Sequence, residues 1–349
     1  MAETLQGEVK LATIAQHRAE PSAQLLIVVL NYRTADLTLA CLRSLERELP
    51  GLSSVEVVVT DNASGDGSAD KIASVIADNA MGTWARCEPL PKNGGYAYGN
   101  NAPIRNALRS KHPPEFVLLL NPDTELLPGA INALLAFMRA HPECGIAGSR
   151  LIDEQGQTHR SAFNFPSAWS ELDRGIELGL VTRLLAKHTI ARPIPDQPTE
   201  VDWVAGASMM VRREVFDAIG LIDEAYFLYF EEVDFLLRAK RAGFRTYYVP
   251  DSRVVHHMGA STGVTDVKKP PSRIPTYWFD SRRRYFLKNH GVAHALLADA
   301  AFLGGRALRK LRLVVAPKVT RPDPPHMLRD YLQNGVLARG TKLAPAQIA

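Results

Sequence analysis

The feature that most constrains the fold of this chain is a run of five apolar residues that stops at a polar turn. Residues Phe116–Leu120 have the composition of a buried strand, and Asn121, Pro122 and Asp123 follow directly. Because Pro122 fixes φ and lacks an amide donor, the chain must leave the sheet there. Ligands of open α/β sheets bind at the carboxyl ends of strands, so Asp123 lies where a functional carboxylate is expected. Taken alone, however, the tripeptide favours an ordinary turn with a solvated acid.

Strand-like runs alternate with helical patterns through the first 123 residues. Strands are predicted at residues 25–30, 55–59 and 85–90, with helices over 37–45, 69–79 and after residue 101. This alternation predicts an α/β fold with a Rossmann-like, mostly parallel sheet flanked by helices.

The second half of the chain is less regular and is expected to end in a helical extension. The predicted elements are a helix-like stretch at 169–187, helices at 213–219, 232–242 and 292–315, and a strand at 246–249 that Pro250 closes. We therefore expect a flexible lead-in at 1–23, one α/β domain at 24–267 and a basic helical extension at 268–349.

Composition is typical of a soluble globular protein. The 349 residues are 46% hydrophobic and 22% charged. No apolar run approaches the ~20 residues that span a bilayer, and the N-terminus lacks a signal-peptide pattern, so a cytoplasmic location is expected. The three cysteines have no CxxC spacing, which predicts neither a disulfide framework nor a zinc site.

Charge is distributed unevenly. Residues 268–349 contain 16 Lys and Arg against 4 Asp and Glu, a net charge of +12 that leaves −8 for the rest of the chain. A basic segment of this kind suits an anionic membrane surface or a diphosphate-bearing substrate, and an ordinary packing helix with a solvated basic face is the alternative. No nucleic-acid partner is expected, because no reader motif is present. The residues concerned are the aromatic cluster 277–279, Arg282, Arg283, Arg284, Arg306, Arg309, Lys310 and Arg312.

Three polar segments follow successive predicted strands, at residues 61–68, 93–101 and 121–123. In a parallel sheet these loops emerge at the same edge and form one crevice, which suits a nucleotide. The glycines of segment 93–101 allow close backbone approach, but neither a Walker A nor a G-x-G-x-x-G pattern is present. The phosphate charge therefore needs another partner, and a divalent metal on Asp123 is expected to supply it. A turn followed by a helix cap is the alternative for 61–68.

A second acidic group, Glu231, Glu232 and Asp234, precedes an apolar-periodic helix and follows an aromatic stretch. The acids could simply stabilise the helix N-terminus, an effect of ~0.3–1 kcal/mol. Alternatively, the aromatic residues wall a pocket in which one carboxylate serves as a base. Further on, His256 or His257 could complete a metal shell with Asp123.

Together these segments resemble the family 2 glycosyltransferases, inverting enzymes with the GT-A fold, and specifically the rhamnosyltransferase-like branch. The resemblance covers residues 24–261. Its matching segments are Asn31-Tyr32, the Asp-Asn-x-Ser-x-Asp-Gly-Ser of 61–68, the Asn-x-Gly-Tyr-x-x-Gly-Asn-Asn of 93–101, the Asn-Pro-Asp of 121–123, 203–207, the acidic 231–234 and His256-x-x-Gly259-x-Ser261.

The resemblance implies roles for particular residues. Asp123 is implied to bind Mg²⁺ or Mn²⁺ on the donor diphosphate, with His256 as a second ligand, and Asp61 to contact the nucleotide base. Glu232 is the implied catalytic base, although glutamate stands where aspartate is usual, so Glu231 and Asp234 remain alternatives. The implied nucleotide-sugar site comprises Asn31, Tyr32, Asp61, Asn62, Asn93, Gly94, Gly95, Asn100, Asn101, Asn121 and Gly206.

The implied activity is inverting transfer of a sugar, with rhamnose suggested by the resemblance alone. The donor would be a dTDP- or UDP-sugar and the acceptor a hydroxyl of a glycan or lipid-diphosphate-linked glycan in cell-surface polysaccharide synthesis, with peripheral contact at the inner face of the cell membrane. A carboxylate base with an ordinary pKa of ~4.3 would suffice. The alternatives are a sugar-nucleotide-forming nucleotidyltransferase, whose Gly-rich, basic N-terminal loop is missing here, and a non-catalytic carbohydrate-binding protein.

Overall fold

The computed structural model of this chain describes residues 25–52, 54–257, 271–316 and 322–348. Its strands are β1 Leu25–Asn31, β2 Val55–Asp61, β3 Ala85–Pro89, β4 Phe116–Leu120, β5 Thr124–Leu126, β6 Cys144–Ile152, β7 Ala162–Phe163, β8 Thr199–Val201, β9 Trp203–Val204, β10 Ser208–Arg212 and β11 Arg245–His256. The main sheet has the order β3-β2-β1-β4-β10-β6-β11-β5, and β8 pairs with β11. The parallel order of β3, β2, β1 and β4 confirms the prediction, whereas β10 runs antiparallel to both β4 and β6.

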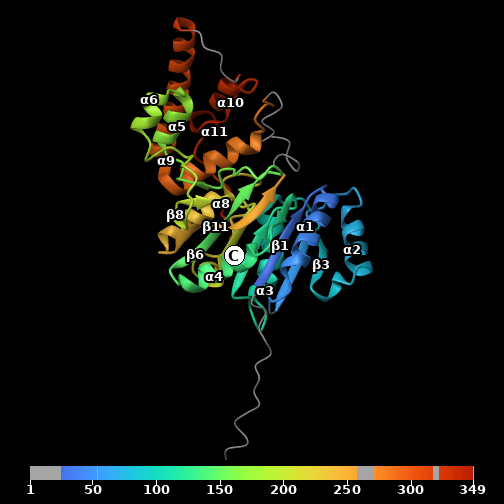
Figure 1. Cartoon of the computed structure of the whole chain (residues 1–349). Helices are drawn as coiled ribbons and strands as arrows, with labels where there is room; N and C mark the ends of the chain where they lie inside the picture. Colours follow the sequence, from blue (N-terminus) through green and yellow to red (C-terminus); the bar gives the residue numbers. More distant parts are fainter. Residues whose placement is uncertain (1–24, 53, 258–270, 317–321, 349) are drawn as a thin grey trace, which may run out of the picture.

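Helices flank this sheet, and a second group of helices lies beyond one end of it (Figure 1). The helices are α1 Ala35–Glu48, α2 Ser68–Asp78, the 3₁₀ helix η1 Met81–Thr83, α3 Gly95–Leu108, α4 Ala130–Ala140, α5 Ala168–Ile176, α6 Gly179–Leu184, α7 Arg213–Ile219, α8 Glu231–Arg241, α9 Thr276–Val315, α10 Met327–Asn334 and α11 Val336–Arg339. The group beyond the sheet consists of α5, α6, α9, α10 and α11.

Alternating side chains of the central strands supply two separate cores. In β1, Leu25, Ile27 and Val29 pack with α1, α2 and α4 on one face of the sheet. Leu26 and Val28 of the same strand pack with α3, α7 and α8 on the other face. Because both faces are covered, the central strands consist of apolar residues without polar alternation, and their polar residues are confined to the strand ends.

Three predicted boundaries are wrong. The segment 93–101 is a loop only as far as Gly94, because α3 begins at Gly95 and includes two of the three glycines that suggested a loop, Gly95 and Gly99. The strand predicted at 246–249 continues through Pro250 to His256, because a register shift between Val249 and Arg253 accommodates the proline. The stretch predicted as one helix at 169–187 is two helices, α5 and α6.

Helix α9 begins well before the predicted 292–315 helix, at Thr276. It consists of two limbs that meet at Gly291, whose φ of 80° and ψ of 174° interrupt the helix. The second limb corresponds to the predicted helix. The first limb contains the aromatic cluster 277–279 and the arginines 282–284, which therefore lie on a helix packed against the rest of the protein.

Several arginines predicted to face a membrane are instead buried in ion pairs, which corrects that part of the sequence interpretation. Arg282 pairs with Glu171 and Asp299, and Arg284 pairs with Asp223. Arg306 and Arg309 are also buried, and both contact Glu177 and Asp323. A search of the described helices finds none with the length and apolarity that a bilayer-spanning segment requires.

Candidate functional site

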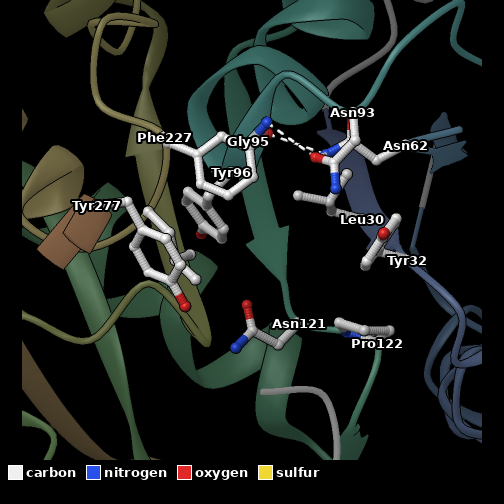
Figure 2. Close-up of a pocket in the computed structure, with 11 residues that line it drawn as sticks. Leu30, Tyr32, Asn62, Asn93, Gly95, Tyr96, Asn121, Pro122, Phe227 and Tyr277 are labelled. Carbon is white, nitrogen blue, oxygen red and sulfur yellow. Dashed lines mark hydrogen bonds between the residues drawn. The ribbon is translucent and has the colours of Figure 1, made fainter. Parts of the chain in front are cut away.

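A cavity of about 380 Å³ opens at the carboxyl ends of β1, β2 and β4 (Figure 2). Five of the residues predicted for the nucleotide-sugar site line it: Tyr32, Asn62, Asn93, Gly95 and Asn121. Six further lining residues were not among those predicted for the nucleotide-sugar site: Leu30, Tyr96, Pro122, Phe227, Leu228 and Tyr277. Phe227 belongs to the aromatic stretch that was predicted to wall a pocket. The convergence of all three polar segments on one cavity is what the parallel order of the strands predicts.

Tyr277 is the most distant contributor in sequence. It belongs to the first limb of α9, and Figure 2 shows it beside Phe227 on the wall opposite Tyr32. The Phe227 and Tyr277 rings lie 5.5 Å apart. The aromatic cluster at 277–279 was a visible signal in the sequence, but its place beside a basic run suggested a membrane surface instead.

Hydrogen bonds among the lining residues fix one wall of the cavity. Asn62 Nδ2 donates to Asn93 Oδ1 at 3.0 Å and to the Gly95 carbonyl at 3.1 Å. Asn93 Oδ1 also accepts a hydrogen bond from the Gly95 amide. On the other side, the Tyr96 hydroxyl donates to the Gly206 carbonyl at 2.7 Å. These bonds couple the end of β2, the start of α3 and the chain before β10.

The remaining predicted nucleotide-sugar residues do not line the cavity, and Asn31, Asp61 and Asn101 instead bond neighbouring segments of the chain. Asp61 is buried and accepts hydrogen bonds from Asn31 Nδ2 at 2.6 Å and from the Ser64 amide at 2.9 Å. Asn101 donates to the Ile222 carbonyl and thereby ties α3 to the chain before α8. Gly94, Asn100 and Gly206 likewise lie outside the residues that line the cavity. The contact of Asp61 with a nucleotide base therefore stays a prediction.

Asp123 and His256 come together beside this cavity. Asp123 follows the lining residue Pro122 and is 1% exposed, and its Oδ1 lies 3.4 Å from Nε2 of His256. Nδ1 of His256 is buried without a hydrogen-bond partner among the described residues. A carboxylate oxygen next to an imidazole nitrogen is a donor pair that suits Mn²⁺.

His257, the alternative metal ligand, has other partners. Its ring lies between Glu125 and Glu154, at 3.0 and 2.9 Å. Burial alone would lower the pKa of His257, but the hydrogen bonds to these two carboxylates outweigh it and raise the pKa above the ordinary value. His256 is thus the histidine that faces Asp123, while Gly259 and Ser261 of the predicted motif lie outside the described residues.

The two adjacent glutamates of the acidic group begin α8. Glu231 is 3% exposed and Glu232 is partly buried, and Oε2 of each carboxylate has no hydrogen-bond partner among the described residues. Burial raises the pKa of Glu232 to about 6 against the opposing effect of backbone hydrogen bonds. The pKa of Glu231 is raised further, by burial and by the neighbouring Glu232 charge. Both carboxylates therefore have a higher pKa than the ordinary value that would suffice for the base.

The backbone just before these glutamates is strained. Tyr229 and Phe230 both have positive φ, 68° and 67°, although neither is glycine. Each such residue costs about 1–3 kcal/mol and persists only where surrounding structure enforces it, most often at functional sites. Burial and the charges of Glu232 and Glu231 also raise the pKa of Tyr96, which links the glutamates electrostatically to the cavity lining.

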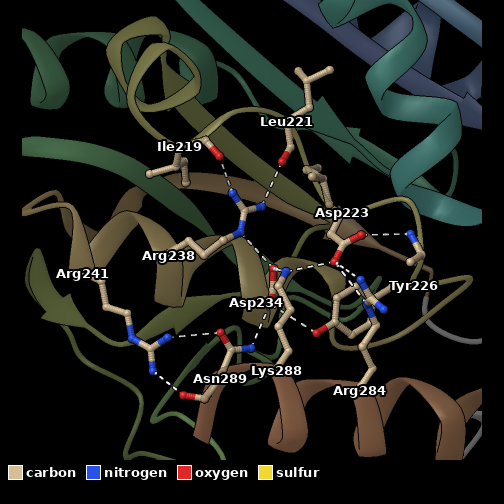
Figure 3. A network of polar contacts seen from close by, with 12 residues as sticks. Ile219, Leu221, Asp223, Tyr226, Asp234, Arg238, Arg241, Arg284, Lys288 and Asn289 are labelled. Carbon is tan, nitrogen blue, oxygen red and sulfur yellow. Dashed lines mark hydrogen bonds and ion pairs between the residues drawn. The ribbon is translucent and has the colours of Figure 1, made fainter. Parts of the chain in front are cut away.

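Asp234 lies in a different environment, a polar network between α8 and α9 (Figure 3). It is fully buried, and its Oδ2 accepts from Arg238 at 2.9 Å and from Lys288 at 2.7 Å. Lys288 also bonds Asp223, which is paired with Arg284. The Asp234 carboxylate therefore has its charge balanced by two cations.

The comparisons with known proteins agree with this geometry. A family model described as "Glycosyltransferase like family 2" matches residues 7–272. An N-acetylglucosaminyl-diphospho-decaprenol L-rhamnosyltransferase of Mycobacterium tuberculosis is 29% identical over 300 residues, covering 77% of this chain and 93% of that protein. The dTDP-rhamnosyl transferase RfbF of Shigella flexneri is 24% identical over 237 residues, covering 67% of this chain and 71% of that protein.

Solved structures share the fold at low sequence identity. The mannosyltransferase PcManGT from Pyrobaculum calidifontis, solved with GDP-Man and Mn²⁺, is 15% identical with a TM-score of 0.52, covering 85% of this chain and 76% of that one. GalNAc-T7, solved with UDP, GalNAc and Mn²⁺, is 14% identical with a TM-score of 0.56, covering 90% and 55%. These likenesses establish the GT-A type of fold.

Proposed function

Because this chain belongs to the family 2 glycosyltransferases, we propose that it transfers a sugar, rhamnose in the first instance, from a dTDP- or UDP-linked donor to a lipid-diphosphate-linked glycan. The donor and acceptor classes follow those in the names of the Shigella flexneri and Mycobacterium tuberculosis relatives. Family membership speaks against the nucleotidyltransferase and non-catalytic alternatives. The reaction belongs to cell-surface polysaccharide synthesis on this proposal.

The observation that carries the proposal is the convergence of three strand ends on one cavity beside the Asp123–His256 pair. Asn62, Asn93 and Asn121 offer uncharged donors and acceptors to a nucleoside and its sugar. The aromatic rings of Tyr32 and Tyr277 offer apolar faces for stacking. We assign the donor to this cavity.

A divalent metal ion fits beside the donor cavity. Asp123 and His256 supply an oxygen and a nitrogen ligand 3.4 Å apart. The described residues contain no group of three or more His, Cys, Asp or Glu side chains able to hold a metal ion, so water and the donor's phosphates would complete the coordination. When bound, Mg²⁺ or Mn²⁺ would neutralise charge on the departing diphosphate.

Glu232 is the base in this proposal. A carboxylate with a pKa near 6 is ionised at neutral pH and accepts a proton more readily than one with an ordinary pKa. As the acceptor hydroxyl attacks the anomeric carbon, its proton passes to Glu232 while the bond to the diphosphate breaks. A single displacement of this kind inverts the anomeric centre and forms no covalent enzyme intermediate. Asp234, which two cations neutralise, is assigned to positioning α8.

We extend the proposal to peripheral contact with the inner face of the cell membrane. Leu180 and Leu184 of α6 and Leu308 and Leu311 of α9 are 54–78% exposed, and Lys310 is exposed beside the latter pair. Apolar side chains with nearby cations favour an anionic lipid surface. Sedimentation with vesicles containing phosphatidylglycerol tests this, with Leu308→Gln/Leu311→Gln expected to weaken binding.

The donor assignment is tested by thermal denaturation with dTDP-, UDP- and GDP-sugars in the presence of Mn²⁺. A ligand that binds only the folded state raises the melting temperature, by an amount that grows with its concentration relative to Kd. We expect a dTDP- or UDP-sugar to stabilise the wild type and to lose this effect in Asn62→Ala. A protein that none of these nucleotides stabilises would contradict the proposal.

A further inference from the structure

A second cavity, of about 260 Å³, adjoins the donor cavity. The two share Phe227 and Tyr277, which line both of them. The second cavity is otherwise lined by Ala225, Asp280, Ser281, Arg283, Arg284, Leu343 and Ala344. Its walls come from the turn before α8, the first limb of α9 and the C-terminal segment.

The C-terminal segment is held in place by the same arginines. Arg283 donates to the Gly340 carbonyl at 3.1 Å, and Arg284 donates to the Ala344 carbonyl at 2.7 Å. Further along, the Leu221 amide donates to the Ile348 carbonyl at 2.9 Å. The segment therefore closes a cavity against α9 and is anchored at both of its ends.

The lining of this cavity contains two cations, Arg283 and Arg284, and one carboxylate, Asp280. Arg284 is neutralised by Asp223, and Lys288 bridges Asp223 and Asp234. Arg283 has only a distant contact with a carboxylate, 3.8 Å to Asp280, which is half exposed. Nε of Arg283 is buried and has no hydrogen-bond partner among the described residues. Because Nη1 of Arg283 donates to the Gly340 and Lys342 carbonyls, Nη2, which lies 3.8 Å from Asp280, is the nitrogen available to a phosphate group in the cavity.

We infer that this second cavity binds the diphosphate of the acceptor, with Arg283 as its principal cation. The inference rests on the proposed function, because only a lipid-diphosphate-linked acceptor brings a second diphosphate to the enzyme. In such an acceptor a sugar separates the reacting hydroxyl from the diphosphate. The diphosphate site must therefore lie next to the donor cavity without being part of it, as this cavity does. Phe227 and Tyr277 then contact the acceptor sugar between the two sites.

Binding of farnesyl diphosphate in the presence of EDTA tests the inference, because without metal the donor cavity has little means of holding a diphosphate. Two variants are expected to act in opposite directions. Arg283→Gln removes the cation and should weaken binding about fivefold or more, whereas Asp280→Asn removes the opposing carboxylate and should strengthen it by up to about fivefold. Asp280→Asn breaks no close contact, so its effect is informative even if Arg283→Gln disturbs the C-terminal segment.

An arginine and an aspartate outside both cavities provide matched controls for the two variants. Arg329→Gln and Asp251→Asn change exposed residues outside both cavities and should leave farnesyl diphosphate binding unchanged. UDP binding with Mn²⁺ should be unaffected by Asp280→Asn and lost in Asn62→Ala. If the wild type binds UDP but not farnesyl diphosphate, the inference fails and the proposed donor site stands. If the wild type does not bind UDP with Mn²⁺, the proposed donor site fails.

Two further results would overturn the inference. One is unchanged or weaker farnesyl diphosphate binding in Asp280→Asn. The other is complete displacement of farnesyl diphosphate by saturating UDP in the presence of Mn²⁺, since the inference requires both to be bound at once. Inorganic pyrophosphate should compete with farnesyl diphosphate, and farnesol should not, because the diphosphate carries the recognition.

Discussion

Gly95 packs against the backbone of Phe227 so closely that a Cβ atom on Gly95 would lie 1.9 Å from the Phe227 carbonyl oxygen. The next amide, that of Tyr96, donates a hydrogen bond to the same oxygen at 3.0 Å. Gly95 also has a φ of +87°, which L-residues rarely adopt. The start of α3 and the aromatic segment before α8 thus form one continuous wall of the donor cavity.

We predict that Gly95→Ala abolishes donor binding and lowers the free energy of unfolding by more than the ~1–3 kcal/mol of backbone strain alone. The methyl group would have to displace backbone, which cannot move aside as a flexible side chain can. Gly243→Ala is the matched control, because Gly243 has a φ of +94° and open space where its Cβ would lie. Urea unfolding compares the two variants. Equal losses of stability would show that the Phe227 contact is unimportant.

The pKa of Glu232 predicts the pH dependence of transfer. Burial raises this pKa to about 6 in the folded protein. The base must be ionised, so activity should be constant above about pH 7 and fall about tenfold per pH unit well below 6. Initial rates measured from pH 4.5 to 8, with structure checked at each pH, test this. A rate that stays constant down to pH 4.5 would contradict the assignment.

Substitution of Glu232 tests whether it, rather than Glu231, is the base. Glu232→Gln should retain donor binding and reduce transfer by ~10²–10⁴-fold, the usual contribution of a positioned base. Glu46→Gln, at an exposed position on α1, is the control and should leave transfer unchanged. Full transfer by Glu232→Gln would move the role of base to Glu231.

Local patterns in the sequence predicted the parallel strands and the polar residues at their ends, because both depend on neighbours in the chain. The sequence did not predict the environment of residues whose contacts come from distant parts of the chain. Asp234 is neutralised by Lys288, and Tyr277 reaches the cavity only because α9 folds back onto the sheet domain. The arginines of the basic extension were predicted to face a membrane, because the contacts that bury them, such as that of Arg282 with Glu171 more than a hundred residues away, leave no local pattern in the sequence.

The polar network between α8 and α9 is predicted to stabilise the fold. Removing one member of a buried ion pair typically costs ~3–5 kcal/mol, because the remaining charge is left uncompensated. Asp234→Asn should therefore lower the free energy of unfolding by several kcal/mol. Asp36→Asn breaks the exposed Asp36–Lys71 pair and should cost ~0–1 kcal/mol. Denaturant unfolding at pH 7 measures both, and similar values would argue against the network.

The same network predicts acid sensitivity. Burial opposes ionisation of Asp223, but hydrogen bonds from Lys288 and Arg284 outweigh it and lower the pKa to about 2. An acid whose pKa is lower in the folded state stabilises the protein above its unfolded pKa, and this contribution is lost as pH falls. Asp223 should thus contribute about 2 kcal/mol that disappears as pH falls from about 4 to about 2. Asp223→Asn should flatten this part of the stability profile.

The Asp123–His256 pair predicts which acid at the strand ends confers metal dependence. Asp123 lies 3.4 Å from an imidazole whose other nitrogen has no partner among the described residues, whereas Asp61 is saturated by hydrogen bonds from Asn31 and Ser64. Asp123→Ala should therefore abolish the additional stabilisation by UDP that Mn²⁺ provides, while Asp61→Asn should lower stability and retain the Mn²⁺ effect. Thermal denaturation with UDP, with and without Mn²⁺, measures both outcomes without requiring turnover. If Asp123→Ala keeps the full Mn²⁺ effect, the metal must bind elsewhere, and the assignment of the donor diphosphate to this edge of the sheet would fail with it.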